Sequence, residues 1–389
     1  MKKNISILGS TGSIGETTLK IIKKKNNLFS VNILVANSNY KKIREQIKKF
    51  KPKIFIIKDK KIFLKVSQDF KNHSTIILNH HYNIPQKYKK NDFIISAIPG
   101  LVGLEPTIFF IKYTKKILLA NKESIICGWE IISKTARKYK TKIIPIDSEH
   151  FSIQKLIKNH KKEEIEKIFI TASGGPFLNL KKDKFKNINP NQAINHPTWN
   201  MGKKISIDSA TMMNKVLEIL EAQKIFPFSV DQYEIVIHPQ SLVHAIVKFK
   251  NGVVMFLYHE TNMIIPIANA LFDFDININD FINRKKSKIG NLNFLKVDEK
   301  KFPVVKLLPK LNKFISGPII INAANEILID HFLKRKISYN SISKYLSLVL
   351  KNKNYRKYAI QKPSNLNKIN TIDNWSRNVT LGIINAKKY

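Results

Sequence analysis

Short apolar runs alternate with longer amphipathic stretches over residues 1–149. The runs have the length of strands and are rich in Ile and Val, whereas the stretches between them repeat apolar residues at helical spacing. The expected strands are ISIL, VNILVA, KIFII, TIIL, DFIISAI, KILLA and KIIPI, and the helices include ETTLKIIKKK, YKKIREQIKKF and GLEPTIFFIKY. Because strands that alternate with helices form parallel sheets covered on both faces, this α/β region is predicted to be a doubly wound, Rossmann-like nucleotide-binding domain.

The pattern changes after residue 149. Residues 150–285 mix a helix, MMNKVLEILEAQKIF, with the strand runs YEIVIH, SLVHAIVKF and GVVMFLYH, the last two joined by a hairpin turn at Asn251–Gly252. They are predicted to form a separate α+β catalytic domain. Residues 286–311 form a Lys-rich linker, and residues 312–389 show only helical periodicity, so a C-terminal helical domain is expected.

Charge changes the list of possible partners. The 389 residues contain 68 Lys and Arg against 28 Asp and Glu, a net charge of +40. Such a charge is typical of nucleic-acid binding, but the lysines are spread over every segment without an RNA-recognition or zinc-finger signature. A chain-wide enrichment in Lys, Ile and Asn is the simpler explanation, and the charge favours phosphorylated small substrates over nucleic acid.

The expected compartment follows from three further features. No apolar stretch approaches the roughly 20 residues that a membrane span needs, and no targeting segment is recognisable at the N-terminus. The single cysteine, Cys127, excludes an intrachain disulfide and is expected to be a small core residue. The sequence therefore predicts a soluble cytoplasmic protein that binds no membrane.

The first strand ends in a glycine-rich loop, GSTGSIG, that leads into a helix. Glycines there allow a tight turn and bring the free N–H groups of the helix to a pyrophosphate, which predicts a dinucleotide site. An NAD site carries an acid after the second strand, but here that strand is followed by Asn37, Ser38 and Asn39. Since Lys41 and Lys42 are near enough to donate to a 2′-phosphate, NADPH is predicted over NADH.

Two acids follow the strand KIIPI, in the stretch PIDSEHFSIQ. Asp147 and Glu149 would point the same way if strand geometry continued through Ser148, at the sheet edge where such folds bind ligands. Two carboxylates there suit Mg²⁺ or Mn²⁺. The alternative is that Asp147 or Ser148 caps the helix that begins near His150. A third acid, Glu218, lies three residues after Lys215 on one helix face, as a site residue or as a solvated ion pair.

Seven segments together resemble the 1-deoxy-D-xylulose 5-phosphate reductoisomerase family. They are GSTGSIG, LLANKES, PIDSEH, TASGGPF, HPTWNMGKKISIDSATMMNKVLE, IHPQSLVH and NAANE, in order from residue 5 to about 330. The resemblance implies an NADPH-dependent oxidoreductase of the non-mevalonate isoprenoid route. It would use Mg²⁺, Mn²⁺ or Co²⁺ to convert 1-deoxy-D-xylulose 5-phosphate to 2-C-methyl-D-erythritol 4-phosphate, and it would be a homodimer.

The resemblance also implies residue roles. The metal ligands would be Asp147, Glu149 and Glu218, and the catalytic residues Lys122, Glu149 and His196. The substrate would contact Lys122, Ser148, Glu149, Ser173, His196, Ser209, Asn214, Lys215 and Glu218. NADPH would contact Thr11, Gly12, Ser13, Ile14, Asn37, Ser38, Asn39, Asn121, Glu123 and Gly202. Residues 192–203, which include Trp199, would form a mobile lid over the substrate.

Some positions leave alternatives open. Val216 stands where the family motif has Gly, and Asn37 and Ser38 depart from its usual Gly and Lys. Trp199 is either a lid residue or a core anchor, and His150, His238 and His244 are either structural or site-lining residues. Two other functions remain: an NADP-dependent oxidoreductase without an isomerase step, and a basic nucleic-acid-binding protein on a Rossmann scaffold.

Overall fold

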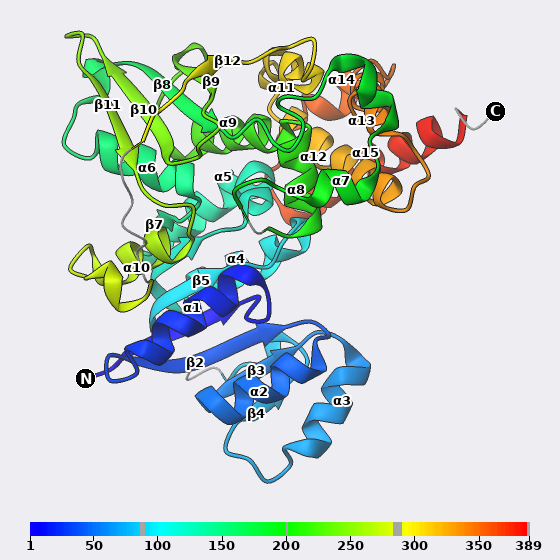
Figure 1. Ribbon diagram of the computed structural model, residues 1–389. Coiled ribbons are helices and arrows are strands. Elements are labelled where there is room, and N and C mark those ends of the chain that lie inside the picture. Colours follow the sequence, from blue (N-terminus) through cyan, green and yellow to red (C-terminus); the bar gives the residue numbers. More distant parts are fainter. Residues whose placement is uncertain (86–89, 200, 283–289, 387–389) are drawn as a thin grey trace. The chain divides into compact units, whose positions relative to one another are not determined.

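The computed structural model describes residues 1–85, 90–199, 201–282 and 290–386. The described chain divides into two compact units (Figure 1). The first comprises Met1–Ser124, Trp129–Asp147 and Met263–Lys288, and the second comprises Ile125–Gly128, Ser148–Asn262 and Ile289–Tyr389. Each unit is built around its own sheet.

The first unit contains the predicted parallel sheet. Its seven strands run in the order β4-β3-β2-β1-β5-β6-β7, and all neighbouring pairs are parallel. The strands are β1 Lys3–Leu8, β2 Phe29–Ala36, β3 Ile54–Ile57, β4 Ile76–Leu78, β5 Asn91–Ser96, β6 Thr114–Leu119 and β7 Lys142–Pro145. The order changes direction between β1 and β5, and doubly wound sheets bind ligands where this occurs, at the carboxyl ends of the strands. The predicted Rossmann-like fold is confirmed.

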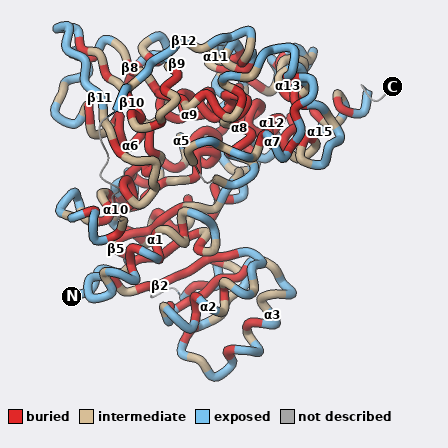
Figure 2. The backbone as a smooth tube through the Cα atoms, in the orientation of Figure 1, coloured by how far each residue is buried: buried red, intermediate tan, exposed pale blue. Residues whose placement is uncertain are grey.

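Helices cover this sheet, and one of them comes from a distant part of the chain. They are α1 Ser13–Lys24, α2 Tyr40–Phe50, α3 Lys60–Asp69, α4 Leu104–Ile111, α5 Lys122–Tyr139 and α10 Ile264–Phe272. The sequence grouped α10 with residues 150–285, but α10 packs against α1. Ile267 and Leu271 are buried in the same core as Ile5 and Ile7, because α10 offers an apolar face that this core completes. Figure 2 shows β2 and β5 buried along most of their length, and β1 is buried from Ile5 to Leu8.

The second unit contains a five-stranded mixed sheet in the order β11-β10-β8-β9-β12. Its strands are β8 Ile165–Ala172, β9 Tyr233–Ile237, β10 Val243–Phe249, β11 Val254–Tyr258 and β12 Leu295–Lys296. β10 and β11 form the hairpin that Asn251–Gly252 predicted, with Gly252 at φ +88°. The sequence did not predict β8, because its apolar run follows a stretch of charged residues.

Helices complete the second unit. Helices α6 Ser148–Ile157 and α9 Met213–Ile225 lie against the sheet, whereas α7 Pro190–Ile194 packs on α8 Lys203–Ala210, and α8 also contacts α9 and the C-terminal helix α12 Gly317–Leu333. The other C-terminal helices are α11 Leu308–Asn312, α13 Tyr339–Leu350, α14 Tyr355–Ala359 and α15 Leu366–Ala386. Helices α12, α13 and α15 pack on one another, as the helical periodicity predicts. The predicted linker begins at residues 286–289, which lie outside the described residues. None of the described helices is both long enough and apolar enough to cross a membrane.

Candidate functional site

A tight loop at the carboxyl end of β1 forms the first part of the site. Gly9 has φ +90°, and a Cβ atom there would lie 2.6 Å from the Ala97 carbonyl oxygen. A Cβ at Gly15 would lie 2.4 Å from the Gly9 carbonyl oxygen. Gly12 precedes α1 and has no side chain to cap it, so the first N–H groups of the helix are free to bind an anion. This is the geometry that a pyrophosphate needs.

The residues after β2 border this loop. Lys42 donates from Nζ to the Thr11 carbonyl oxygen at 3.3 Å and pairs with Glu16 at 2.7 Å, which connects α2 to the glycine-rich loop. Asn39 accepts from the Lys42 N–H at 3.2 Å and thereby caps α2. The structure therefore brings the two predicted cofactor-binding segments, 11–14 and 37–39, to neighbouring strand ends.

A third segment follows β6. The Asn121 carbonyl oxygen Oδ1 accepts from the Ser124 N–H at 2.8 Å, and its Nδ2 donates to the Gly100 carbonyl oxygen at 3.1 Å. Next to it, Lys122 Nζ lies 3.2 Å from Asp147 Oδ2. Asn121, Lys122 and Glu123 are all buried, so this segment is held in place at the ligand-binding edge of the sheet.

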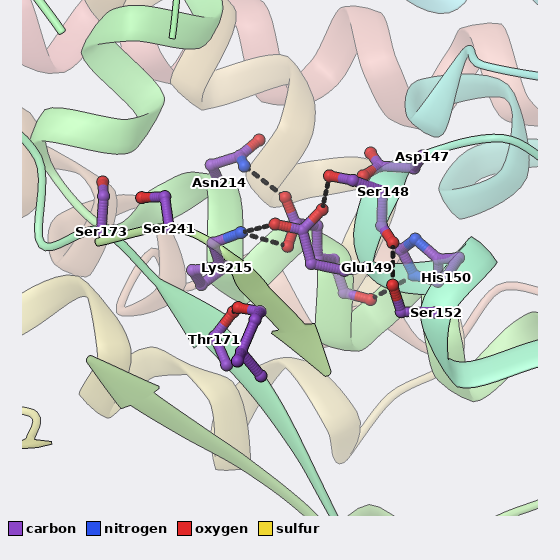
Figure 3. Close-up of polar contacts among 12 residues, drawn as sticks. Asp147, Ser148, Glu149, His150, Ser152, Thr171, Ser173, Asn214, Lys215 and Ser241 are labelled. Carbon is purple, nitrogen blue, oxygen red and sulfur yellow. Dashed lines mark hydrogen bonds and ion pairs between the residues drawn. The ribbon is translucent and has the colours of Figure 1, made fainter. Parts of the chain in front are cut away.

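Two acids of the second unit converge on one lysine (Figure 3). Lys215 Nζ lies 2.7 Å from Glu218 Oε2 and also donates to Glu149 Oε1. Asn214 Nδ2 donates to the other oxygen of Glu218, and the Ser148 hydroxyl donates to Glu149 Oε2 at 2.5 Å. All five side chains are buried. The first turn of α6 supplies Ser148 and Glu149, and the first turns of α9 supply the other three.

The reason for this convergence differs from the expected one. The alternation argument for Asp147 and Glu149 is wrong, because β7 ends at Pro145 and Ser148 already begins α6. Carboxylate oxygens of Glu149 and Glu218 lie within 4.8 Å of each other because α6 and α9 pack together. Asp147 ends the first unit, and only Ser148 separates it from Glu149 along the chain.

The electrostatics of the cluster favour cations. Burial alone would lower the pKa of Lys215, but the carboxylates of Glu149 and Glu218 outweigh it and raise that pKa above its ordinary value. Lys215 therefore stays protonated. Two buried carboxylates facing one ammonium group are a set of hard oxygen donors already arranged around a positive charge.

His196 and Ser173 form a second group near Lys215. His196 Nδ1 accepts from the backbone N–H groups of Thr198, at 3.2 Å, and Trp199, at 3.0 Å. Neutral His196 therefore carries its proton on Nε2, which donates to the Ser173 hydroxyl at 2.9 Å. Burial, with the nearby Lys215 ammonium adding to it, lowers the pKa of His196 to about 4.

The loop that carries Ser173 lies against α8. A Cβ at Gly175, where φ is +66°, would lie 3.0 Å from the Ser209 carbonyl oxygen, so only glycine allows this approach. Ser173 and Ser209 are thus parts of one packed surface. Gly202 is exposed at the start of α8, in the unit that does not contain the other predicted cofactor-binding residues. Within the predicted lid, Asn200 lies outside the described residues.

Sequence reasoning overlooked several polar neighbours. Thr198 Oγ1 donates to Ser241 Oγ at 3.2 Å, and Ser241 has φ +55°, which is uncommon for a serine. His259 stacks on His244 with ring centroids 3.8 Å apart and lies close enough to Glu149 for the carboxylate to affect its pKa. Thr198 and Ser241 belong to two of the segments that carry the resemblance, but the sequence does not show these contacts, because the partners of each residue are distant in the chain.

Two of the histidines left open also have defined surroundings. His150 is fully buried, with Nε2 3.0 Å from the Glu218 carbonyl oxygen and Nδ1 3.7 Å from Glu221. Trp199 contacts His244 edge-on, at 6.0 Å between ring centroids. His150 therefore supports the helix that carries Glu218, and Trp199 has a packing partner within the second unit.

A glycine-rich phosphate loop on one unit and paired carboxylates on the other define the class of a nucleotide-dependent enzyme with a cation site. Family models of 1-deoxy-D-xylulose 5-phosphate reductoisomerase match residues 5–128, and models of its C-terminal domains match residues 143–226 and 259–379. The chain belongs to the 1-deoxy-D-xylulose 5-phosphate reductoisomerase family.

Individual relatives agree. The reductoisomerase of Pelagibacter ubique is 46% identical over 380 residues, which cover 96% of this chain and 97% of that protein. That of Wolbachia pipientis wMel is 41% identical, covering 87% and 88%. Among solved structures, a reductoisomerase in complex with NADPH, fosmidomycin and magnesium superposes with a TM-score of 0.91 at 33% identity, covering 99% of both chains. The Zymomonas mobilis enzyme in complex with NADPH gives 0.86 at 30% identity, also covering 99% of both.

Proposed function

We propose that this protein converts 1-deoxy-D-xylulose 5-phosphate to 2-C-methyl-D-erythritol 4-phosphate, using NADPH and a divalent metal ion. The observation that carries the proposal is the convergence of Glu149 and Glu218 on Lys215, in a chain of this family. Buried acids can hold a divalent ion, and this reaction needs such an ion to polarise neighbouring oxygens of a sugar phosphate.

The donor set fits the metal. Glu149 and Glu218 offer carboxylate oxygens, the ligands that Mg²⁺ and Mn²⁺ prefer, and Asp147 is tethered one residue from Glu149. When bound, the ion polarises the carbonyl and the neighbouring hydroxyl of the substrate, and NADPH supplies the hydride that reduces the rearranged aldehyde. Lys215 occupies the space between the two acids and would turn away as the metal ion enters.

Lys122 and Ser148 are proposed to contact the carbon chain of the substrate. Asp147 holds the Lys122 ammonium at 3.2 Å, which orients it so that it can stabilise negative charge on a substrate oxygen or donate a proton. The Ser148 hydroxyl is directed to Glu149 at 2.5 Å. That bond orients the carboxylate and leaves the hydroxyl oxygen free to accept from a substrate hydroxyl.

The phosphate group of the substrate is proposed to bind Ser173, Ser209, Asn214 and Lys215. These residues offer hydroxyls, an amide and an ammonium group, which is a suitable set for a phosphate dianion. His196 is neutral at neutral pH and donates from Nε2 to the Ser173 hydroxyl, so it can orient that hydroxyl toward the phosphate. If a metal ion replaced Lys215 at the two acids, the Lys215 ammonium would be available to bind the same phosphate.

The cofactor is proposed to bind the loop 11–14, the segment 37–39, Asn121, Glu123 and Gly202. NADPH is preferred because the residues directly after β2, Asn37 to Asn39, include no acid, whereas Lys42, fixed by Glu16 and Thr11, can pair with a 2′-phosphate. Residues 192–203 are proposed to close over the substrate and exclude water, with Pro197 and Trp199 in the described part of this lid.

We also propose a cytoplasmic homodimer. Strand β11 lies at the edge of its sheet, and Val254, Met255 and Phe256 on it are exposed, as is Val253 just before it. An exposed apolar edge strand is commonly covered by a partner, and a second copy of the chain would do so. The one cysteine, Cys127, is buried and cannot form an intrachain disulfide, which suits a reducing compartment.

The test is the oxidation of NADPH by purified, folded protein. We expect the absorbance of NADPH to fall only when both the deoxyxylulose phosphate and Mg²⁺ or Mn²⁺ are present, with one NADPH consumed per methylerythritol phosphate formed. Turnover of a simple ketone without metal would indicate an oxidoreductase with no isomerase step. Tight, strongly salt-dependent binding of nucleic acid without turnover would support the binding-protein alternative instead.

A further inference from the structure

His80, His81 and Glu105, whose side chains are of kinds that can bind metal ions, lie together on the first unit. The proposed function uses none of them. His80 precedes the short 3₁₀ helix η1, His81–Asn83, and His81 begins it. Glu105 lies in the first turn of α4. One ligand atom of each lies within 4.8 Å of the others, so the cluster joins two segments that are 24 residues apart.

His81 is the buried member of this group. Only 2% of its surface is exposed, and its ring lies 4.8 Å from that of Phe109 and 4.4 Å from that of Tyr82, measured between centroids. Its Nε2 is buried and has no hydrogen-bond partner among the residues that the structure describes. Leaving a buried polar atom without a partner is unfavourable, so a ligand at this nitrogen would stabilise the fold.

An ordinary ion pair does not explain the arrangement. His81 Nε2 and Glu105 Oε1 are 3.8 Å apart, which is too far for a hydrogen bond. The nitrogen faces the carboxylate without bonding to it, and a metal ion bound to both atoms would complete this arrangement.

We propose that His80, His81 and Glu105 form a second metal site, for a divalent transition metal of the Zn²⁺ class. Two imidazoles and one carboxylate are typical ligands of such ions, whereas Mg²⁺ prefers oxygen alone. Three protein ligands leave the fourth position of a tetrahedral ion to water. The ligand atoms must move closer together to bind one tetrahedral ion. Small rotations of the His80 and Glu105 side chains would bring them together, because neither side chain is buried.

The surroundings already orient the ligands. The Tyr82 hydroxyl donates to Glu105 Oε1 at 2.7 Å, as outer residues commonly do for a ligating carboxylate. His80 Nδ1 accepts from the Tyr82 N–H at 3.3 Å, which leaves Nε2 as its ligand atom. Lys58 places a positive charge near both histidines. We therefore expect weaker binding than in a structural zinc finger.

A metal ion here would link η1 to the start of α4. The residues before α4 hold the amide of Asn121, whose Nδ2 donates to the Gly100 carbonyl oxygen and to that of Ile98. A bound ion would therefore stabilise the loop next to the proposed cofactor-binding segment, without contacting substrate or cofactor.

The test is a titration with Zn²⁺ and Co²⁺ of protein carrying both Glu149→Gln and Glu218→Gln, which removes acids of the catalytic cluster. We expect one Zn²⁺ per chain, and with Co²⁺ the visible absorption of a nitrogen-ligated, four-coordinate ion. Adding His81→Gln should weaken Zn²⁺ binding at least tenfold. The matched control is His160→Gln, because His160 pairs with Glu164 at 3.0 Å on the surface and should leave binding unchanged.

Two results would overturn the proposal: no saturable Zn²⁺ binding in the double variant, or binding that His81→Gln leaves unchanged. If circular dichroism shows that the His81→Gln protein does not fold, Glu105→Gln decides, because Glu105 is partly exposed and its amide can still accept from Tyr82. That variant should also lose at least tenfold in affinity. The measurement needs no turnover, so its failure is distinct from a failure of the proposed activity.

Discussion

The ammonium group of Lys215 lies 2.7 Å from the carboxylate of Glu218, one turn away on the same helix. Lys215 also donates to Glu149 from α6, so one cation neutralises two buried acids. Without Lys215, like charges would face each other where solvent screens them little. We therefore infer that Lys215 stabilises the cluster before a metal ion binds.

The first prediction concerns this stabilising role. In the presence of a chelator, Lys215→Gln should lower the free energy of unfolding by about 3 kcal/mol, because it removes one partner of a buried ion pair. Saturating Mg²⁺ should restore part of the loss by taking over the neutralisation. Urea denaturation with and without Mg²⁺ measures both. The matched control is Lys248→Gln, which removes an exposed pair with Glu166 at 2.6 Å and should cost less than about 1 kcal/mol. Equal losses in the two variants would contradict the role given to Lys215.

The second prediction concerns the phosphate group. Ser173→Ala should raise the KM for the deoxyxylulose phosphate about tenfold, since it removes a hydroxyl that would bind the phosphate. The same hydroxyl accepts a hydrogen bond from the Gly175 N–H at 3.0 Å, which the variant also loses. The KM for NADPH should change little. Ser347→Ala is the control, because the Ser347 hydroxyl donates to the Ser343 carbonyl oxygen within α13. A Ser173→Ala protein with an unchanged KM for the sugar phosphate would remove Ser173 from the phosphate site.

The third prediction is a pH dependence. The pKa of His196 is lowered to about 4 in the folded protein, whereas an unfolded histidine has a pKa of about 6.5. Between these values the unfolded chain binds the proton and the folded chain does not, so stability is complete above about pH 6.5 and falls as the pH is lowered toward 4. One such group accounts for up to about 2 kcal/mol between pH 7 and pH 5.

Urea denaturation across this range checks it. His196→Gln should flatten the pH profile relative to the unmodified protein, and His160→Gln, at an exposed position, should not. His81 has a lowered pKa as well, so some slope should remain in the His196→Gln protein. Profiles that coincide for all three proteins would show that His196 does not titrate in the way its surroundings indicate.

The fourth prediction concerns the dinucleotide loop. Gly15→Ala should raise the Kd for NADPH at least tenfold, because the added Cβ would lie 2.4 Å from the Gly9 carbonyl oxygen and displace the loop. Fluorescence titration with NADPH measures it. Gly382→Ala, where a Cβ would meet no atom within 4 Å, serves as the control for alanine in a helix. Unchanged NADPH affinity in the Gly15→Ala protein would place the cofactor elsewhere.

Periodicity and local motifs could predict much of this molecule. The seven strands of the first sheet, α9 and the β10–β11 hairpin follow from apolar spacing and from Asn251–Gly252, because these signals lie within a few residues of one another. The pairing of Lys215 with Glu218 follows from helical spacing in the same way. Such features need no knowledge of the rest of the chain.

Features that depend on distant packing could not be predicted. The placement of α10 against α1 depends on an apolar face that the first unit completes, and the meeting of Glu149 with Lys215 depends on how α6 packs beside α9. Ser241 and His259 are ordinary residues until the fold places Thr198 and His244 next to them. In each case the determining partner is far away in sequence.

The central claim is that Glu149 and Glu218 hold the divalent ion on which NADPH-dependent turnover relies. The most direct measurement compares the Glu218→Gln and Glu166→Gln proteins in the NADPH oxidation assay at increasing Mg²⁺ concentration. Glu166 is an exposed acid of the same unit. We expect Glu218→Gln to reduce kcat at least a hundredfold and to shift the Mg²⁺ dependence to higher concentration, while Glu166→Gln behaves like the unmodified protein. Near-normal turnover and Mg²⁺ dependence in a folded Glu218→Gln protein would contradict the account.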